Sequence, residues 1–171
     1  MPEDEKIDVV DENGNFIEVV YKGEAHQKGL LHKTVIGAVV NSKGEWLLVK
    51  PVLGRQDAGQ YVFPVGGHVT SGEKEVDAIR RETAEEIGIT GDFTCELVDR
   101  RIFNREIIGR KENHLFLIYK ISSDASPVLG DEDESLEYFT EDEIRKNAKE
   151  NPKFFGDAFY FVAQSFFPGL R

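Results

Sequence analysis

The chain has 171 residues, a length typical of one domain, and its hydrophobic and charged fractions of 40% and 31% are ordinary for a globular protein. Its net charge of −11 argues against a nucleic-acid polymer as partner, because an acidic surface repels phosphate groups. No apolar run approaches the roughly 18 residues of a membrane-spanning helix, and residues 1–6 do not begin a signal peptide. The single cysteine, Cys95, excludes an internal disulfide, and we expect a cytoplasmic protein.

Alternating apolar residues predict short strands through the first 65 positions. In chain order, they are residues 7–10, 16–21, 34–40, 46–52 and 61–65. Turns rich in Gly, Asn and Asp join the first two strands and the next two, and the last strand leads into Gly66 and Gly67. This pattern predicts antiparallel pairs that precede a glycine-rich turn.

The second half of the chain predicts helices and further strands. An amphipathic helix is expected at residues 74–87, with Thr70 and Glu73 at capping-box spacing before it and Gly88 as its stop. Later elements are strands at 93–103, at 114–121 and near Tyr138, a polar connection at 104–113, a helix that starts at Thr140, and an aromatic helix at 154–167. The order predicts an α+β fold, an α/β/α sandwich with a mixed β-sheet. We expect residues 1–171 to form a single domain, with residues 1–32 as an N-terminal hairpin and lead-in segment.

Three glutamates of the predicted helix share one sector of its surface. At about 100° per residue, Glu82, Glu85 and Glu86 fall within a wedge of roughly 100°, beside the core-facing positions Val76 and Ile79. Carboxylates that converge at the edge of a core repel one another, and a divalent cation relieves the repulsion. Mg²⁺ suits this arrangement, because it accepts a few carboxylates and completes its coordination with water and substrate phosphate. From geometry alone, a solvated acidic helix face stays open as the alternative.

Seven residues around this helix have the spacing of a known motif. They are Gly67, Glu73, Arg81, Glu82, Glu85, Glu86 and Gly88, in the order G-x5-E-x7-R-E-U-x-E-E-x-G-U, where U is an aliphatic residue. This segment resembles the Nudix box, and the surrounding strands resemble the order of that family. Ile89 fits the last aliphatic position, whereas Thr83 departs from the other one but keeps a β-branched shape.

The resemblance implies a metal-dependent hydrolase of phosphoric anhydrides, with Mg²⁺ as cofactor and Mn²⁺ as a substitute. By position, Glu82, Glu85 and Glu86 resemble the set that binds the metal and supplies the general base. Arg81 resembles the arginine that pairs with Glu73 and orients the catalytic glutamates.

Two further metal ligands follow from the same resemblance. The carbonyl of Gly66 resembles a backbone ligand at the transition from loop to helix. Glu132, six residues before Tyr138, is the candidate for the acid that many members add from a later loop. The alternative for residues 131–134 is an ordinary solvated acidic turn.

The histidines resemble those of type I isopentenyl diphosphate isomerases, a branch of the same fold. His26, His32 and His68 stand where that branch has metal-binding histidines, Glu112 matches one of its two acids, and His114 takes the place of the other. Histidine and carboxylate from separate elements make a reasonable set of ligands for a transition metal. For each histidine, an ordinary surface or hydrogen-bonded core role is the alternative.

Two departures count against isomerase activity. Gly66 fills the position of the isomerase's catalytic cysteine, and the Nudix box is intact, whereas the isomerases usually have a degraded one. We therefore interpret the chain as a hydrolase on the isomerase-like branch. Isomerase activity is one alternative, and a catalytically silent ligand sensor of the same fold is another, although such sensors often lose box glutamates.

Four residues are candidates for substrate binding. Lys33, Lys50 and Arg55 could contact phosphate groups, and Tyr61 could stack on a base. As alternatives, each cation could be a solvated surface residue and the tyrosine a part of the core. We expect a small phosphorylated substrate, a nucleoside diphosphate derivative or a nucleoside triphosphate, and neither a nucleic-acid polymer nor a membrane as partner. A homodimer is compatible with the sequence.

Overall fold

An eight-stranded sheet forms the centre of the computed structural model, which describes residues 4–171. Residues 1–3, which belong to the predicted domain 1–171 and to the segment 1–6, lie outside the described part. The strands are β1 Lys6–Val10, β2 Phe16–Tyr21, β3 His32–Val40, β4 Trp46–Pro51, β5 Val65–His68, β6 Thr94–Ile107, β7 Arg110–Ser122 and β8 Asp133–Phe139. The helices are α1 Lys22–Lys28, α2 Glu75–Ile87, α3 Glu141–Glu150 and α4 Asp157–Phe166, followed by a short 3₁₀ turn Pro168–Leu170.

β3 organises the sheet, because four other strands pair with it. β7 pairs with it in parallel, from His32 opposite His114 to Val40 opposite Ser122, whereas β1, β4 and β5 pair with it antiparallel. β6 extends the sheet beyond β7, and β8 extends it beyond β4. The predicted mixed sheet is confirmed, and the parallel register sets two histidines side by side.

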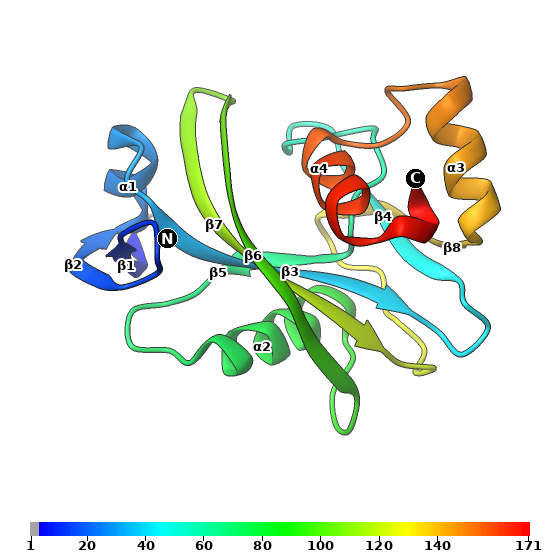
Figure 1. Cartoon of the computed structure of the whole chain (residues 1–171), viewed down its shortest axis with the longest axis horizontal. Helices are drawn as coiled ribbons and strands as arrows, with labels where there is room; N and C mark the ends of the chain where they lie inside the picture. The colour runs from blue at the N-terminus through cyan, green and yellow to red at the C-terminus, as the bar shows by residue number, and fades with distance from the viewer. Residues whose placement is uncertain (1–3) are drawn as a thin grey trace.

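Helices cover both faces of the sheet, as the predicted α/β/α sandwich requires. Figure 1 shows α2 below the sheet and α3 and α4 above it. The buried Ile79 and Ile87 of α2 belong to one apolar cluster with Leu117 and Ile121, while Phe159 of α4 belongs to a second, aromatic cluster. Burial of apolar surface on both faces stabilises the strands that carry the candidate site.

The β6–β7 hairpin is longer than the sequence predicts. Residues 104–113, expected to be a polar connection, continue both strands as far as Ile107 opposite Arg110. Ile108 and Gly109 make the turn with positive φ angles of 51° and 71°, the conformation that tight two-residue hairpin turns require. The polar composition is misleading because this end of the hairpin projects beyond β3 (Figure 1), where Arg105 and Glu112 bond to each other and do not pack in an apolar core.

Two smaller expectations are wrong, and the lead-in segment contains a helix for which the sequence analysis makes no prediction. Residues 22–28 of the lead-in segment form a helix, α1, which ends at Gly29 in the left-handed conformation. The strand expected at 61–65 begins only at Val65, and isolated bridges precede it. Val76, expected to face the core, is 45% exposed, because burial along α2 begins only at Ala78.

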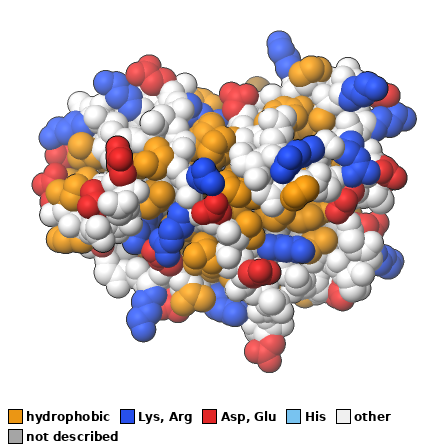
Figure 2. All heavy atoms as spheres, in the orientation of Figure 1, with side chains coloured by type: hydrophobic (Ala, Val, Ile, Leu, Met, Phe, Trp, Pro, Cys, Tyr) orange, Lys and Arg blue, Asp and Glu red, His pale blue; other side chains and the backbone are white. Residues whose placement is uncertain are grey.

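Two further observations bear on the surface. None of the helices within residues 4–171 is long and apolar enough to cross a membrane. Figure 2 shows that basic, acidic and apolar side chains are interspersed over the face of the molecule that it draws, without a large patch of one charge sign. A phosphorylated ligand would therefore depend on local cations within a cavity.

Candidate active site

One cavity collects most of the candidate residues. It has a volume of about 970 Å³ and is lined by parts of β3, β5, α2, the loop 53–60 and the β6–β7 hairpin. Its lining includes Gly66, Glu82, Glu85, Glu86 and Glu132. The fold thus brings the acid that directly precedes β8 to the same space as the glutamates of α2.

Gly67 allows α2 to lie directly against β5. A Cβ atom at this position would overlap the carboxylate of Glu82, and pairing with β3 keeps the strand from moving away. Glu82 is consequently only 7% exposed. The glycine is therefore needed for the close approach of a buried carboxylate to the backbone.

Thr83, the one departure from the box, is accommodated within the core. It is fully buried, and its hydroxyl donates to the carbonyl of Ile79 at 2.6 Å. A threonine in the middle of a helix can satisfy its hydroxyl in this way, so the polar atom has a partner without disturbing the neighbouring glutamates.

Arg81 contacts three glutamates at once. Its guanidinium donates to Glu73 at 2.7 and 2.9 Å, to Glu82 at 2.7 Å and to Glu85 at 3.2 Å. A further hydrogen bond of 3.0 Å reaches the carbonyl of His68. The contact with Glu73 raises the pKa of Arg81 and lowers the pKa of Glu73, so both side chains stay charged.

Glu73 belongs to a turn before α2, and the helix cap lies elsewhere. Its carboxylate accepts hydrogen bonds from the N–H and the hydroxyl of Thr70, both at 3.1 Å. Lys74 is the N-cap residue of α2, without a side-chain hydrogen bond. The contact between Thr70 and Glu73 therefore closes the turn before α2, and it orients the carboxylate of Glu73 toward Arg81.

Burial raises the proton affinity of two glutamates that line the cavity. Desolvation raises the pKa of Glu82 to about 7, although the contact with Arg81 opposes the shift. Desolvation raises the pKa of Glu86 to about 7 as well, with further contributions from the negative charges of Glu82 and Glu132. A divalent cation among these side chains would favour their charged forms.

One of the four candidate substrate-binding residues lines this cavity. Arg55 does so, and its Nη2 donates to Glu132 at 2.8 Å. Lys33 and Lys50 are not among the lining residues of the described chain, although residues on either side of Lys50 and directly after Lys33 are. Alternation along a strand turns these two lysines to the other face. Tyr61 is 6% exposed and belongs to the aromatic core.

Four histidines form a compact cluster next to the glutamates. His26 comes from α1, His32 from β3, His68 from β5 and His114 from β7. One ring nitrogen of each lies within 4.8 Å of the others, and within residues 4–171 no other set of three or more His, Cys, Asp and Glu side chains converges so closely. Nε2 of His26 lies 3.2 Å from Nε2 of His68 and 3.4 Å from Nε2 of His114.

The geometry and electrostatics of this histidine cluster fit a transition-metal ion. Zinc–nitrogen bonds of about 2.0–2.1 Å in a tetrahedron separate the ligand nitrogens by about 3.3 Å. The distances of 3.2 and 3.4 Å from Nε2 of His26 are close to this value, and all four nitrogens lie within 4.8 Å of one another. Burial lowers the pKa of His26 and of His32 to about 4. Burial and the neighbouring histidines also hold the pKa of His68 and of His114 well below the usual range. The imidazoles are therefore neutral, which is the form that binds metals.

His32 presents a lone pair to the cluster. Its Nδ1 lies 2.8 Å from the carbonyl of Leu30, and a carbonyl can only accept, so Nδ1 carries the proton. Its Nε2 is then the basic nitrogen, and this atom is buried without a hydrogen-bond partner among the described residues. A cation bound among the four imidazoles would satisfy this acceptor.

Glu112, the acid that the isomerase resemblance adds to this set, is engaged elsewhere. Its carboxylate, 2% exposed, accepts from Nε of Arg105 at 2.9 Å and from Arg110. Arg105 also reaches Asp57 at 3.3 and 3.4 Å. The sequence analysis misses both arginines and Asp57, because only the hairpin pairing and the loop 53–60 make them neighbours. An arginine on each side of a short turn is the one signal that could have pointed to them.

Comparison with known protein families identifies the family of the chain. A family model for the NUDIX domain matches residues 30–158, well over half of the chain. The chain belongs to the Nudix family. The box on α2 and the mixed sheet around it are thus features of a Nudix protein.

The relatives of this Nudix protein include both hydrolases and isomerases. An uncharacterised Nudix hydrolase of Streptomyces coelicolor is 35% identical over 94 residues, which cover 52% of this chain and about half, 49%, of that protein. An isopentenyl-diphosphate Delta-isomerase of Pectobacterium atrosepticum is 29% identical over 150 residues, 86% of this chain and 83% of the isomerase. Among solved structures, DR0079 from Deinococcus radiodurans superposes with a TM-score of 0.71 at 21% identity, covering 94% of this chain and 98% of that one. The structural likeness establishes the shared fold, and the named relatives belong to two reaction classes.

Proposed function

We propose that this Nudix protein is a hydrolase that cleaves a phosphoric anhydride bond in a nucleoside diphosphate derivative or a nucleoside triphosphate, with Mg²⁺ or Mn²⁺ as cofactor. The observation that carries the proposal is the arrangement on α2, where Arg81 braces Glu73, Glu82 and Glu85 beside the cavity. The complete set of fixed box residues and the Nudix hydrolase relatives support the same activity.

Carboxylates and one carbonyl would hold the metal. Glu82, Glu85 and Glu86 offer carboxylate oxygens, Gly66 offers its carbonyl oxygen, and Glu132 adds a carboxylate from the end of the loop before β8. Oxygen ligands of this kind suit Mg²⁺ and Mn²⁺. When bound, the ion neutralises substrate phosphate oxygens and makes water a better nucleophile at neutral pH.

Protein side chains supply the base and its orientation. Glu82 or Glu85 accepts the proton of the attacking water, and a pKa near 7 suits Glu82 to both take up and release a proton. Arg81 holds these two carboxylates with a planar fork of donors, and Glu73 in turn holds Arg81. Arg55, at the cavity wall, is the candidate for a contact with a substrate phosphate.

The isomerase alternative would require a catalytic cysteine, and this chain has Gly66 at that position. Isomerisation adds a proton to one carbon and removes one from a neighbour, so it needs an acid and a base around the substrate. Gly66 has no side chain to titrate, and Cys95 packs against the apolar cluster under the sheet, outside the cavity lining of the described chain. The isomerase relatives are nevertheless the reason to test this activity. A silent sensor is the second alternative, and the complete box argues against it.

We also propose that the histidine cluster, His26, His32, His68 and His114, holds a transition-metal ion such as Zn²⁺. The neutral imidazoles, the convergence of four ring nitrogens within 4.8 Å and the orphaned Nε2 of His32 support this site. Three ligands belong to the sheet and one to α1, so a bound ion would fasten the N-terminal segment to the sheet. Its role would be structural, because four protein ligands leave no open position in a tetrahedral site.

One assay separates the proposed function from both alternatives. The purified chain is incubated with Mg²⁺ and a panel of nucleoside triphosphates and nucleoside diphosphate derivatives, and separately with isopentenyl diphosphate. We expect release of phosphate, pyrophosphate or a nucleoside monophosphate from at least one nucleotide, and no allylic isomer. Allylic product without nucleotide hydrolysis would establish the isomerase, and binding without any turnover would establish the sensor.

A further inference from the structure

The end of the β6–β7 hairpin holds two arginines around one buried glutamate. Arg105 on β6 and Arg110 on β7 both donate to Glu112. Arg105 also donates to Asp57 at 3.3 and 3.4 Å, and Arg110 donates to Gln56 at 3.3 Å. All five residues line the cavity, and their contacts fasten the hairpin to the loop 53–60.

The two arginines differ in how many of their donors are used. Arg105 uses Nε on Glu112 and both terminal nitrogens on Asp57. Arg110 uses only Nη2 in its hydrogen bonds within residues 4–171, and its Nε is buried without a partner there. A buried donor without an acceptor costs free energy, so Arg110 is the side chain that lacks an acceptor.

Arg110 can turn toward a ligand without leaving the buried carboxylate of Glu112 unpaired. Glu112 would lose one partner but keep the 2.9 Å contact with Arg105, so its carboxylate would stay paired. The side chain of Arg110 is 36% exposed, so its own charge stays partly hydrated when it turns away from Glu112. Arg110 is therefore the arginine that can leave Glu112 for a ligand, because Arg105 still pairs with this carboxylate.

Arg110 is the first residue of β7, so it lies at the turn of the β6–β7 hairpin. Figure 1 shows the end of the hairpin above the sheet and α2 below it. The same cavity is nevertheless lined by Glu82 and Glu86 of α2, by His68 and by Arg110. A ligand that fills it would present one end to the glutamates and the other to the hairpin.

We propose that Arg110 binds a phosphate monoester on the part of the substrate remote from the anhydride that is cleaved. The inference rests on the proposed function, because hydrolysis at α2 defines which end is remote. Arginine presents Nε and a terminal nitrogen side by side, which matches two oxygens of one phosphate group. In a chain with a net charge of −11, a phosphate needs such a local cation. The substrate class is a diphosphate-linked compound with an additional phosphate, such as one on a ribose hydroxyl.

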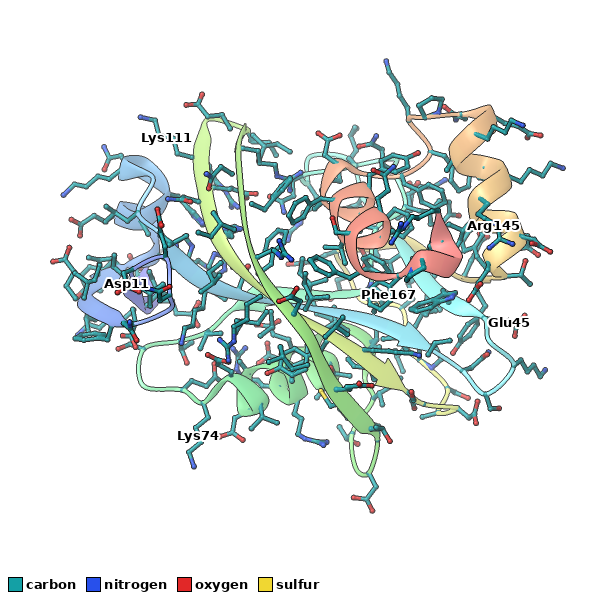
Figure 3. The ribbon with its side chains drawn as sticks, in the orientation of Figure 1. Asp11, Glu45, Lys74, Lys111, Arg145 and Phe167 are labelled. Atoms are coloured by element: carbon teal, nitrogen blue, oxygen red, sulfur yellow. The ribbon has the colours of Figure 1, made fainter. Side chains whose placement is uncertain are left out.

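Matched ligands that differ by one phosphate test this proposal. NADPH differs from NADH by one ribose phosphate, and coenzyme A differs from dephospho-coenzyme A in the same way. Dissociation constants are measured by calorimetry on the full chain, with Ca²⁺ in place of Mg²⁺ so that the readout does not depend on turnover. The variants are Arg110→Gln and Arg110→Lys. Lys111→Gln is the matched control, because Lys111 is the next residue of β7, is exposed and lies against Gly29 at the end of α1 (Figure 3).

For at least one pair, we expect wild type and Lys111→Gln to bind the ligand with the ribose phosphate about tenfold more tightly than the ligand without it. The ratio of the two dissociation constants is thus about ten. Arg110→Gln should bring this ratio near one. Arg110→Lys keeps a cation beside Glu112, so it guards against misfolding, and it should lower the ratio at least about threefold. A wild-type ratio near one for both pairs, or an unchanged ratio in the folded Arg110 variants, would overturn the proposal. Failure of the proposed function would appear separately, as absent hydrolysis with Mg²⁺ while the binding ratios persist.

Discussion

The glutamates of α2 and the histidine cluster respond in opposite directions to the same physical effect. Burial makes a charge costly at both places, so it raises the pKa of Glu82 and of Glu86 to about 7 and lowers the pKa of His26 and of His32 to about 4. Both groups are thereby driven toward neutrality. A neutral imidazole is ready to bind a metal, whereas a carboxyl must first lose its proton. Burial therefore leaves the histidines in the form that binds a cation, whereas a cation at the glutamates would compete with protons.

The two places also differ in their access to solvent. Three of the four histidines are buried, whereas the side chain of Glu85 is 59% exposed. A closed set of nitrogen ligands favours a tightly held transition metal, and an open set of oxygen ligands favours an exchangeable Mg²⁺. We therefore expect one resident ion and one that is exchanged with solvent or substrate.

The largest free-energy effect is expected at the histidine cluster. His32→Gln should abolish retention of the transition metal and lower the free energy of unfolding by about 4 kcal/mol, the stabilisation that an ion at a thousandfold excess over its Kd provides. Elemental analysis and denaturant unfolding, each with and without a chelator, measure the two quantities. Glu86→Gln is the matched variant and should retain this ion. Wild-type protein that binds no Zn²⁺ on dialysis would mean that the histidines are hydrogen-bonded core residues.

The next effect concerns catalysis at α2. Glu86→Gln should lower kcat with Mg²⁺ by at least about a hundredfold, because the metal loses a carboxylate, while the melting temperature stays close to that of wild type. Steady-state kinetics with the best nucleotide of the panel measure this. Asp77→Asn removes an exposed carboxylate from the same helix and should change kcat by less than about twofold. Turnover near the wild-type rate would remove Glu86 from the ligand set.

A smaller effect tests the close approach of β5 to α2. Gly67→Ala would push the new methyl group into the carboxylate of Glu82, and overpacking of this kind costs about 1–3 kcal/mol of stability. In a Glu82→Ala background the overlap is gone, so the same substitution should cost less than about 0.5 kcal/mol. Unfolding of the four proteins measures the coupling. Equal losses in both backgrounds would mean that Gly67 matters only for the backbone.

The smallest effect is the pH dependence of the metal-free protein. The histidines have a lowered pKa, so their contribution to stability is complete above 6.5 and is lost as the pH falls toward 4. The glutamates have a raised pKa, so their contribution is complete below 4.5 and is lost as the pH rises through 7. Relative to wild type, His32→Gln should therefore gain stability as the pH falls, and Glu86→Gln as it rises, each by on the order of 1 kcal/mol. Unfolding in a chelator between pH 5 and 8 measures both, and parallel curves for all three proteins would contradict the comparison.

Spacing along one helix is enough to predict that three glutamates lie together, and all three line the same cavity. Glu82, Glu85 and Glu86 lie within five residues, and helical geometry alone places them in one sector. The sheet and its two helical layers also follow from local patterns, because each apolar strand and amphipathic helix needs a partner for its apolar face. Those expectations depend on neighbours in sequence, where periodicity is informative.

The remaining parts of the cavity depend on contacts between distant segments. Arg105 and Arg110 meet Asp57 only because a polar stretch continues the hairpin and reaches the loop 53–60. Charge alone suggests Lys33 and Lys50 as phosphate contacts. The face on which each lysine lies follows from strand alternation, and its phase depends on the register of the whole sheet. Long-range register has no local signature, so these residues could not be assigned from the sequence.

The parallel pairing of β3 with β7 has a consequence for folding kinetics. His26 and His114 are 88 positions apart in the chain, and α2 and β6 lie between β3 and β7 in the sequence. Contacts across such a separation form late, because the entropy of closing a long loop must be overcome first. A folding intermediate without this pairing has no complete set of imidazoles. The time course of Zn²⁺ capture during refolding would therefore act as a clock for closure of the sheet, separate from the earlier appearance of helical signal.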